Sequence, residues 1–169
     1  MMRKSYARTS ERPGKTQTIN FYRINEGVTS EEVEEREMAP DCYLVDLPGY
    51  GYAGVSLEEK AKWGPMVERY LQGSGMLKKV FLLVDIRHDP TANDVMMHDW
   101  IIKNGFEPVI IATKSDKIKR SQIAKHTANI RKKLNVPGNV PVTPFSALSK
   151  AGLDDVWKLM KSAVAGEDQ

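Results

Sequence analysis

This sequence has almost no cysteine and no long apolar run. Cys42 is the one cysteine among 169 residues, so an intramolecular disulfide is excluded, which agrees with a reducing cytoplasm. No apolar stretch approaches the roughly 18 residues of a membrane span, and the first residues lack the apolar region of a signal peptide. We therefore expect a cytoplasmic protein without a membrane partner, and we interpret Cys42 as a core thiol because it adjoins an apolar run.

Length and composition are typical of a single globular domain covering residues 1–169, with 41% hydrophobic and 28% charged residues. The net charge of +3 hides an asymmetry along the chain. Residues 114–133 hold eight Lys and Arg against one acid, whereas residues 26–37 hold six glutamates against one arginine. A basic face of this kind fits contact with a nucleic acid, and it fits equally a solvated helix face.

Apolar runs alternate with amphipathic segments along the chain. Strands are expected at residues 18–25, 41–46, 80–85, 108–112 and 142–145, and helices at 56–72, 89–105, 123–134 and 153–164. The acidic residues 26–40 between the first two strands are interpreted as a loop or exposed insertion. This order predicts an α/β fold with a mostly parallel sheet and helices on both faces, in which ligands bind at the carboxyl ends of the strands.

Local signals refine these elements. Ser56 and Glu59 form a capping-box pattern, Pro65 is expected to kink the helix that follows, and Asp89 is the expected N-cap of the next helix, with Gly105 as its stop. The runs at 80–85 and 108–112 are typical of strands covered on both faces. The apolar stripe of the last helix is expected in the core: Leu153, Val156, Trp157, Met160 and Val164.

Gly14-Lys15-Thr16 ends like a nucleotide-binding P-loop. Such a loop needs a glycine five positions before the Gly-Lys pair, on a turn entered from a buried strand. Thr9 stands at that position, and the residues before it are polar and basic. This segment is therefore not expected to be a P-loop.

Polar motifs follow three of the expected strands. Asp46-Leu47-Pro48-Gly49 offers a carboxylate for a Mg²⁺-bound water and a glycine N–H for a phosphate. In Thr113-Lys114-Ser115-Asp116, the carboxylate can accept hydrogen bonds from guanine N1–H and the exocyclic amine while the lysine stem lies along the base. Ser146-Ala147-Leu148 can offer a backbone N–H to guanine O6. Adenine lacks the two donors, so the pattern predicts selection for guanine.

The chain resembles the EngB family of TRAFAC-class GTPases from about Arg8 to Val164. The resemblance is carried by PGKTQTINFY, DLPGYGYA, DIRHDP with Asp94 after it, ATKSDK and PFSALSKAG. It implies Ras-type topology, binding of GTP with Mg²⁺, and a role in large ribosomal subunit assembly, with ribosomal RNA or the subunit precursor as partner. It also implies a link to cell division and septation, and a monomer when the domain is complete.

By this resemblance the GKTQT segment is switch I and Asp46 to Gly49 is switch II. The implied GTP-binding residues are Gly14, Lys15, Thr16, Gln17, Thr18, Asp46, Leu47, Pro48, Gly49, Thr113, Lys114, Ser115, Asp116, Phe145, Ser146 and Ala147. Thr16 and Asp46 are the implied Mg²⁺ residues. Thr113 replaces the asparagine of many GTPases, as in the family itself. Tyr50 replaces the glutamine that orients water, so no catalytic residue is assigned and slow hydrolysis is expected.

The family begins with a strand, a Gly-rich P-loop and a helix that have no counterpart in residues 1–169. We expect impaired nucleotide binding and hydrolysis without these parts, and two exposed central strand edges. A start-site error, a deliberate fragment and a degenerate homologue each explain the pattern, the last as a nucleotide-independent RNA- or protein-interaction module. His88 is interpreted as structural, with general-base action as the alternative, and His98 and His126 lack metal-ligand spacing.

Overall fold

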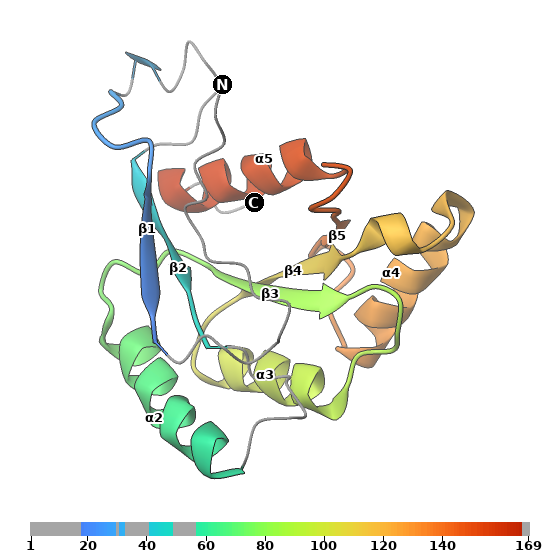
Figure 1. Ribbon diagram of the computed structural model, residues 1–169, viewed down its shortest axis with the longest axis horizontal. Coiled ribbons are helices and arrows are strands. Elements are labelled where there is room, and N and C mark those ends of the chain that lie inside the picture. Colours follow the sequence, from blue (N-terminus) through green and yellow to red (C-terminus); the bar gives the residue numbers. More distant parts are fainter. Residues whose placement is uncertain (1–17, 30, 33–40, 49–56, 167–169) are drawn as a thin grey trace. The chain divides into compact units, whose positions relative to one another are not determined.

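The computed structural model describes residues 18–29, 31–32, 41–48 and 57–166, with the backbone alone for residues 57–64. The elements group into two compact units, residues 1–75 and 76–169, which are described separately (Figure 1). The organisation of the chain as one domain stays a prediction. No helix in the described parts of the chain has the length and apolar character needed to span a membrane.

The first unit contains a two-stranded antiparallel sheet and a helix. Strand β1 (Asn20–Ile24) pairs with β2 (Cys42–Asp46), with Asn20 opposite Asp46 and Ile24 opposite Cys42. Both strands confirm the sequence prediction. Helix α2 (Leu57–Gly73) continues through Pro65, and the ring of its Tyr70 meets Phe21 of β1 edge to face at 5.7 Å. The predicted Ser56–Glu59 cap lies outside the described residues and side chains.

In the acidic segment after β1, residues 31 and 32 are helical and Glu31 is exposed, which fits the expected exposed insertion and differs from a plain loop. The Thr29 hydroxyl accepts from the Glu32 backbone N–H at 3.3 Å, and the Glu32 carboxylate accepts from the Thr29 N–H at 3.1 Å. This reciprocal capping box stabilises helical backbone at residues 31 and 32. Residues 30 and 33–40 lie outside the described residues.

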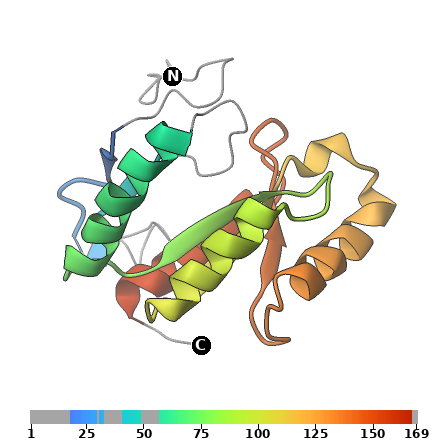
Figure 2. The same cartoon turned by 90° about the horizontal axis from the view of Figure 1, so that it is seen from below.

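The second unit is a three-stranded parallel sheet with helices on both faces, which confirms the predicted α/β class. The strands are β3 (Val80–Asp85), β4 (Pro108–Thr113) and β5 (Val142–Pro144), in the order β3-β4-β5. The helices are α3 (Ala92–Lys103), α4 (Ile123–Lys133) and α5 (Leu153–Ala165), with short 3₁₀ turns η1 (Ser115–Lys117) and η2 (Arg120–Gln122). Figures 1 and 2 show α3 and α5 on opposite faces of this sheet, and α4 beside β5.

Burial differs between the central strand and the elements at the margin of this sheet. Ile110 and Ala112 of β4 are fully buried, as their apolar run predicted. On β3, Leu82 and Val84 are buried but Leu83 is 60% exposed, so the expectation of cover on both faces is wrong for this strand. Alternate side chains point to opposite faces, and only the face with Leu82 and Val84 is closed.

The apolar stripe of α5 is likewise half-buried along its length and not core as expected. An apolar stripe shows which side of a helix seeks cover, and neighbouring elements decide how much cover that side receives.

Helix α3 begins two residues later than predicted. Its N-cap is Thr91, whose hydroxyl accepts from Asp94 N–H at 3.2 Å while the Asp94 carboxylate accepts from Thr91 N–H at 2.7 Å. Asp89 is not the cap, because its carboxylate accepts a hydrogen bond from Asn129 of α4 at 2.7 Å. The predicted stop is confirmed: Gly105 follows the C-cap with φ +82°, a backbone conformation that favours glycine.

The turn between β5 and α5 requires glycine at position 152, and this generates a stability prediction. Gly152 has φ +77°, and a Cβ there would lie 2.1 Å from the carbonyl oxygen of Pro144. Gly152→Ala should lower the free energy of unfolding by about 3 kcal/mol or more in urea titrations, because the left-handed backbone costs about 1–2 kcal/mol and the clash adds to it.

Gly105→Ala is the matched control, because φ is +82° but nothing lies within 4 Å of the added Cβ. It should show the backbone cost alone, about 1–2 kcal/mol. Equal losses for the two variants would contradict the close approach of Gly152 to Pro144.

Candidate functional site

The carboxyl ends of β3 and β4 are joined by hydrogen bonds around Thr113. The Thr113 hydroxyl donates to the Val84 carbonyl at 3.1 Å, and the Ile86 N–H donates to the Thr113 carbonyl at 3.1 Å. Asp85 and Thr113 lie opposite each other in the strand register. Thr113 therefore fixes the point at which its motif leaves the sheet.

Asp116 and Ser146 meet, although 30 residues separate them in the chain. Phe145 N–H donates to the Ala112 carbonyl at 2.8 Å, and Ser115 N–H donates to the Phe145 carbonyl at 3.1 Å. These bonds lay the loop after β5 against the loop after β4. The fully buried Ser146 hydroxyl then donates to Asp116 Oδ1 at 2.7 Å.

The contact with Ser146 favours the ionised form of Asp116. The hydrogen bond from Ser146 lowers the pKa of the Asp116 carboxyl, with a smaller contribution from Lys117, whose ammonium lies 3.3 Å from Oδ2. The Asp116 side chain is 15% exposed. It is therefore an ionised carboxylate at neutral pH, which can only accept hydrogen bonds.

The Ser146 backbone is used within its own loop. Its N–H donates to the Ala151 carbonyl at 3.0 Å, its carbonyl accepts from Lys150 N–H at 2.9 Å, and its hydroxyl accepts from Ser149 N–H at 3.0 Å. The predicted N–H contact with a base therefore does not fall to Ser146. Ala147, the next residue, is exposed.

Lys114 has an unusual backbone and a fixed ammonium. Its φ of 62° and ψ of 34° place it in the left-handed region, which is uncommon for a residue with a side chain and is often found at binding sites. Its Nζ lies 2.8 Å from Asp85 Oδ2. Asp85 also accepts from the Arg87 guanidinium, at 2.9 Å through Nε and at 2.7 Å through Nη2.

Sequence reasoning did not place Asp85 and Arg87 in the site. Both belong to the DIRHDP motif, and Asp85 is the last residue of β3. An acidic residue at the carboxyl end of a strand beside the lysine motif was the available signal.

The geometry suits recognition of a flat ring with two adjacent N–H donors. The ionised carboxylate of Asp116 lies in the loop after β4, and Lys114 precedes it by two residues. In the loop after β5, the exposed Ala147 follows the buried Ser146. Guanine carries N1–H and an exocyclic amine on one edge, and the two carboxylate oxygens can accept from both.

The remaining predicted residues belong to the first unit or lie outside the described residues. Asp46 is exposed at the end of β2, Leu47 is half-buried and Pro48 is buried. The exposed Thr18 has its hydroxyl 3.3 Å from Asn20 Oδ1. Gly14 to Gln17, Gly49 and Tyr50 lie outside the described residues, so the Mg²⁺ role of Thr16 with Asp46 stays a prediction.

A cavity of about 450 Å³ in the first unit is lined by none of the predicted site residues. Its lining is Ile19, Pro65, Met66, Arg69 and Tyr70, at the margin of β1 and α2. We favour the polar ends of β4 and β5 as the site, because chemistry that selects a ligand is present there.

Cys42 is half-buried in β2, so the expectation of a core thiol is wrong, whereas His98 and His126 lie in helices as predicted. Burial raises the pKa of the Cys42 thiol, which fits a structural thiol rather than a nucleophile. His98 is buried in α3, His126 lies in α4, and His88 is exposed in the loop before α3. The structural role of His88 stays a prediction.

Comparison with known proteins places the chain in one family. Residues 1–114 match the family described as 50S ribosome-binding GTPase. A "Probable GTP-binding protein EngB" of Lachnospira eligens is 54% identical over 169 residues, all of this chain and 74% of the relative. A protein of the same name from Lachnoclostridium phytofermentans is 56% identical over 161 residues, 95% of this chain and 73% of the relative.

A solved structure supports the fold. The crystal structure of a probable GTP-binding protein engB superposes with a TM-score of 0.65 over 74% of this chain and 78% of that chain, at 16% identity. Because the two relatives named above are 54% and 56% identical over 100% and 95% of this chain, the chain belongs to the EngB family.

Proposed function

We propose that this chain binds guanine nucleotide at the ends of β4 and β5, as a GTP-binding protein of the EngB family. The observation that carries the proposal is the 2.7 Å hydrogen bond from the buried Ser146 hydroxyl to Asp116. It holds an ionised acceptor where a guanine edge can reach it. Lys114 lies along the base, and Ala147 N–H donates to guanine O6. Phe145 and Ser115 connect the two loops.

Mg²⁺ and the phosphates bind beside the residues of the two switch segments. The exposed Asp46 carboxylate is a hard oxygen donor of the kind that Mg²⁺ prefers, and Thr16 is its proposed companion. Bound Mg²⁺ neutralises phosphate charge. The P-loop that cradles phosphates in related enzymes has no counterpart in residues 1–169, so we expect weak nucleotide affinity and little hydrolysis from this chain.

Replacing the base-reading carboxylate tests the guanine site. Wild-type chain should show ¹H–¹⁵N NMR shifts at residues 113–116 and 146–147 when titrated with GDP, and none with ADP. Asp116→Asn should weaken the response to GDP roughly 10- to 100-fold, since hydrogen bonds to a charged group contribute about 1.5–3 kcal/mol. The same variant should gain a response to xanthosine diphosphate, because an amide can donate to the second xanthine carbonyl.

Asp155→Asn is the matched control, an exposed aspartate in the first turn of α5. It should leave the GDP response unchanged. Equal responses to GDP and ADP in the wild-type chain would reject guanine recognition at these loops.

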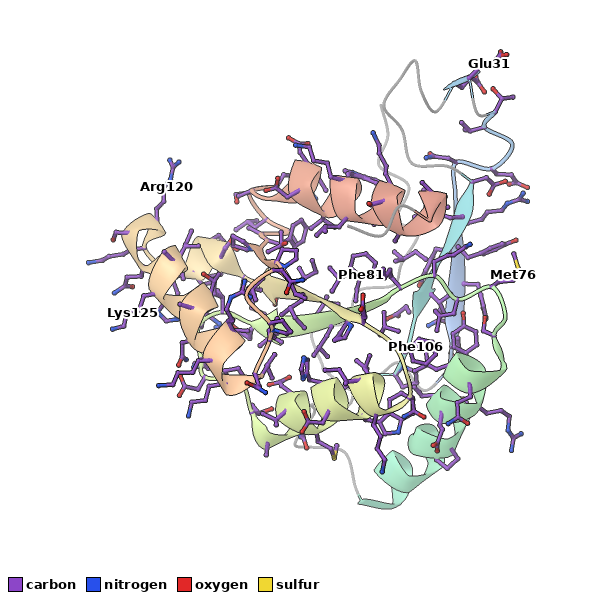
Figure 3. All side chains as sticks on the ribbon, turned by 180° about the vertical axis from the view of Figure 1, so that it is seen from behind. Glu31, Met76, Phe81, Phe106, Arg120 and Lys125 are labelled. Carbon is purple, nitrogen blue, oxygen red and sulfur yellow. The ribbon has the colours of Figure 1, made fainter. Side chains whose placement is uncertain are left out.

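The second part of the proposal is contact with the large ribosomal subunit precursor through ribosomal RNA, during assembly of the subunit. The matched family is described as ribosome-binding, and the α4 region supplies a basic surface. Lys125 and Lys132 are exposed on α4, and Figure 3 shows Arg120 and Lys125 pointing outward. The link to cell division follows from this role.

Arg131 belongs to the same basic run but has a structural partner. It is half-buried, and its guanidinium donates to the Pro137 carbonyl. Lys133 lies 4.0 Å from Asp89. Lys125 and Lys132 are therefore the better probes of an RNA contact.

Charge reversal tests this surface. Lys125→Glu with Lys132→Glu should weaken binding of the chain to precursor large subunits. It should also reduce the slope of log K against log salt by about 2, because each phosphate contact contributes about 1 to that slope. Filter binding between about 50 and 200 mM salt gives the slope.

The control variant is Lys103→Glu with Lys158→Glu, which changes the net charge equally at exposed positions on α3 and α5. If both double variants lose binding to the same extent, overall charge and not the α4 surface governs the contact. Salt-dependent binding by a chain that shows no response to GDP would favour the nucleotide-independent interaction module.

A further inference from the structure

Asp85 is the meeting point of two cations at the end of β3. Arg87 donates to both carboxylate oxygens, at 2.9 Å to Oδ1 and 2.7 Å to Oδ2, and its backbone N–H donates to Oδ1 at 3.1 Å. Lys114 Nζ reaches Oδ2 at 2.8 Å from the loop after β4. A forked arginine contact of this kind fixes the plane of a carboxylate.

The charge state of this cluster follows from the same contacts. Hydrogen bonds from Arg87, and then from Lys114, keep the pKa of Asp85 well below its usual range despite partial burial. The hydrogen bond with Asp85, then the charge of Asp85 and, more weakly, the charge of Asp116 raise the pKa of Arg87. Asp85 and Asp116 therefore belong to one electrostatic cluster at the margin of the sheet.

The two carboxylates of this cluster have different cations beside them. In the structure Lys114 pairs with Asp85, while Asp116 accepts from Ser146 and lies near Lys117. The Lys114 ammonium is thereby held at the end of β3, while the two Asp116 oxygens have Ser146 and Lys117 as neighbours.

We propose that Asp85 is a positioning residue of the base site, which holds the Lys114 ammonium at the end of β3 and so aligns the lysine stem for a purine ring. Arg87 holds Asp85 in the required orientation. This role rests on the proposed guanine site. It gives a function to Asp85 and Arg87 of the DIRHDP motif, in which sequence reasoning interpreted only His88 and Asp89. Lys114 makes this contact from a residue in the left-handed backbone region.

A double-mutant cycle tests whether Asp85 acts through Lys114. Asp85→Asn should weaken the GDP response about three- to fivefold, the size expected for loss of a partly exposed ion pair. In a Lys114→Met background the same Asp85→Asn change should have no further effect, because the residue it positions is gone. A merely structural role would weaken GDP binding equally in both backgrounds.

The ion pair itself is tested without nucleotide. In ¹³C NMR pH titrations, Lys114→Met should raise the pKa of Asp85, because a cationic donor to Oδ2 is removed. The control for both experiments is Glu107→Gln, which breaks an exposed contact of 3.4 Å with Lys79 just before β4 begins, at the opposite end of the strand. This control should change neither the GDP response nor the titration of Asp85.

The outcomes separate the two proposals. A wild-type chain without a GDP response would overturn the guanine site and the positioning role with it. A responding wild-type chain in which Asp85→Asn acts equally in both backgrounds would overturn the positioning role alone. An Asp85 titration unchanged by Lys114→Met would also overturn it, because the ion pair would then be absent in solution.

Discussion

The hydrogen bond from Ser146 to Asp116 is the constraint on which the candidate site depends. A fully buried hydroxyl needs a partner, and this one finds it on the neighbouring loop. The bond joins the loops after β4 and β5, and it lowers the pKa of the Asp116 carboxyl. Gly152 lets the loop after β5 pack closely on Pro144, because a Cβ at this position would lie 2.1 Å from the Pro144 carbonyl oxygen.

At the ends of β3 and β4, each acidic side chain lies beside a basic one. Lys114 forms an ion pair with Asp85, and the Lys117 ammonium lies near the Asp116 carboxylate. Exposed ion pairs of this kind contribute little to stability. These ion pairs act mainly on orientation: Arg87 and Lys114 fix the Asp85 carboxylate at the end of β3.

Sequence reasoning succeeded for features set by a local pattern of residues, and it failed where packing against other elements sets the burial or partner of a side chain. The run of apolar residues in β4 predicted a buried strand, and Ile110 and Ala112 are buried. The same pattern predicted that both faces of β3 are covered, but Leu83 on one face is exposed. An apolar run does not show which faces of a strand other elements pack against. Asp89 was predicted to cap α3, but its carboxylate accepts a hydrogen bond from Asn129 of α4, and Thr91 is the cap.

The sequence by itself determined the order of strands and motifs and the family, because these follow from local patterns of side chains. Tertiary structure decided their partners: Ser146 supports Asp116 through its hydroxyl and not a base through its N–H, and Asp85 joins Lys114. Such pairs connect residues about 30 positions apart. They form only when parallel strands bring their carboxyl ends to one edge of the sheet, and spacing along the chain carries no record of that.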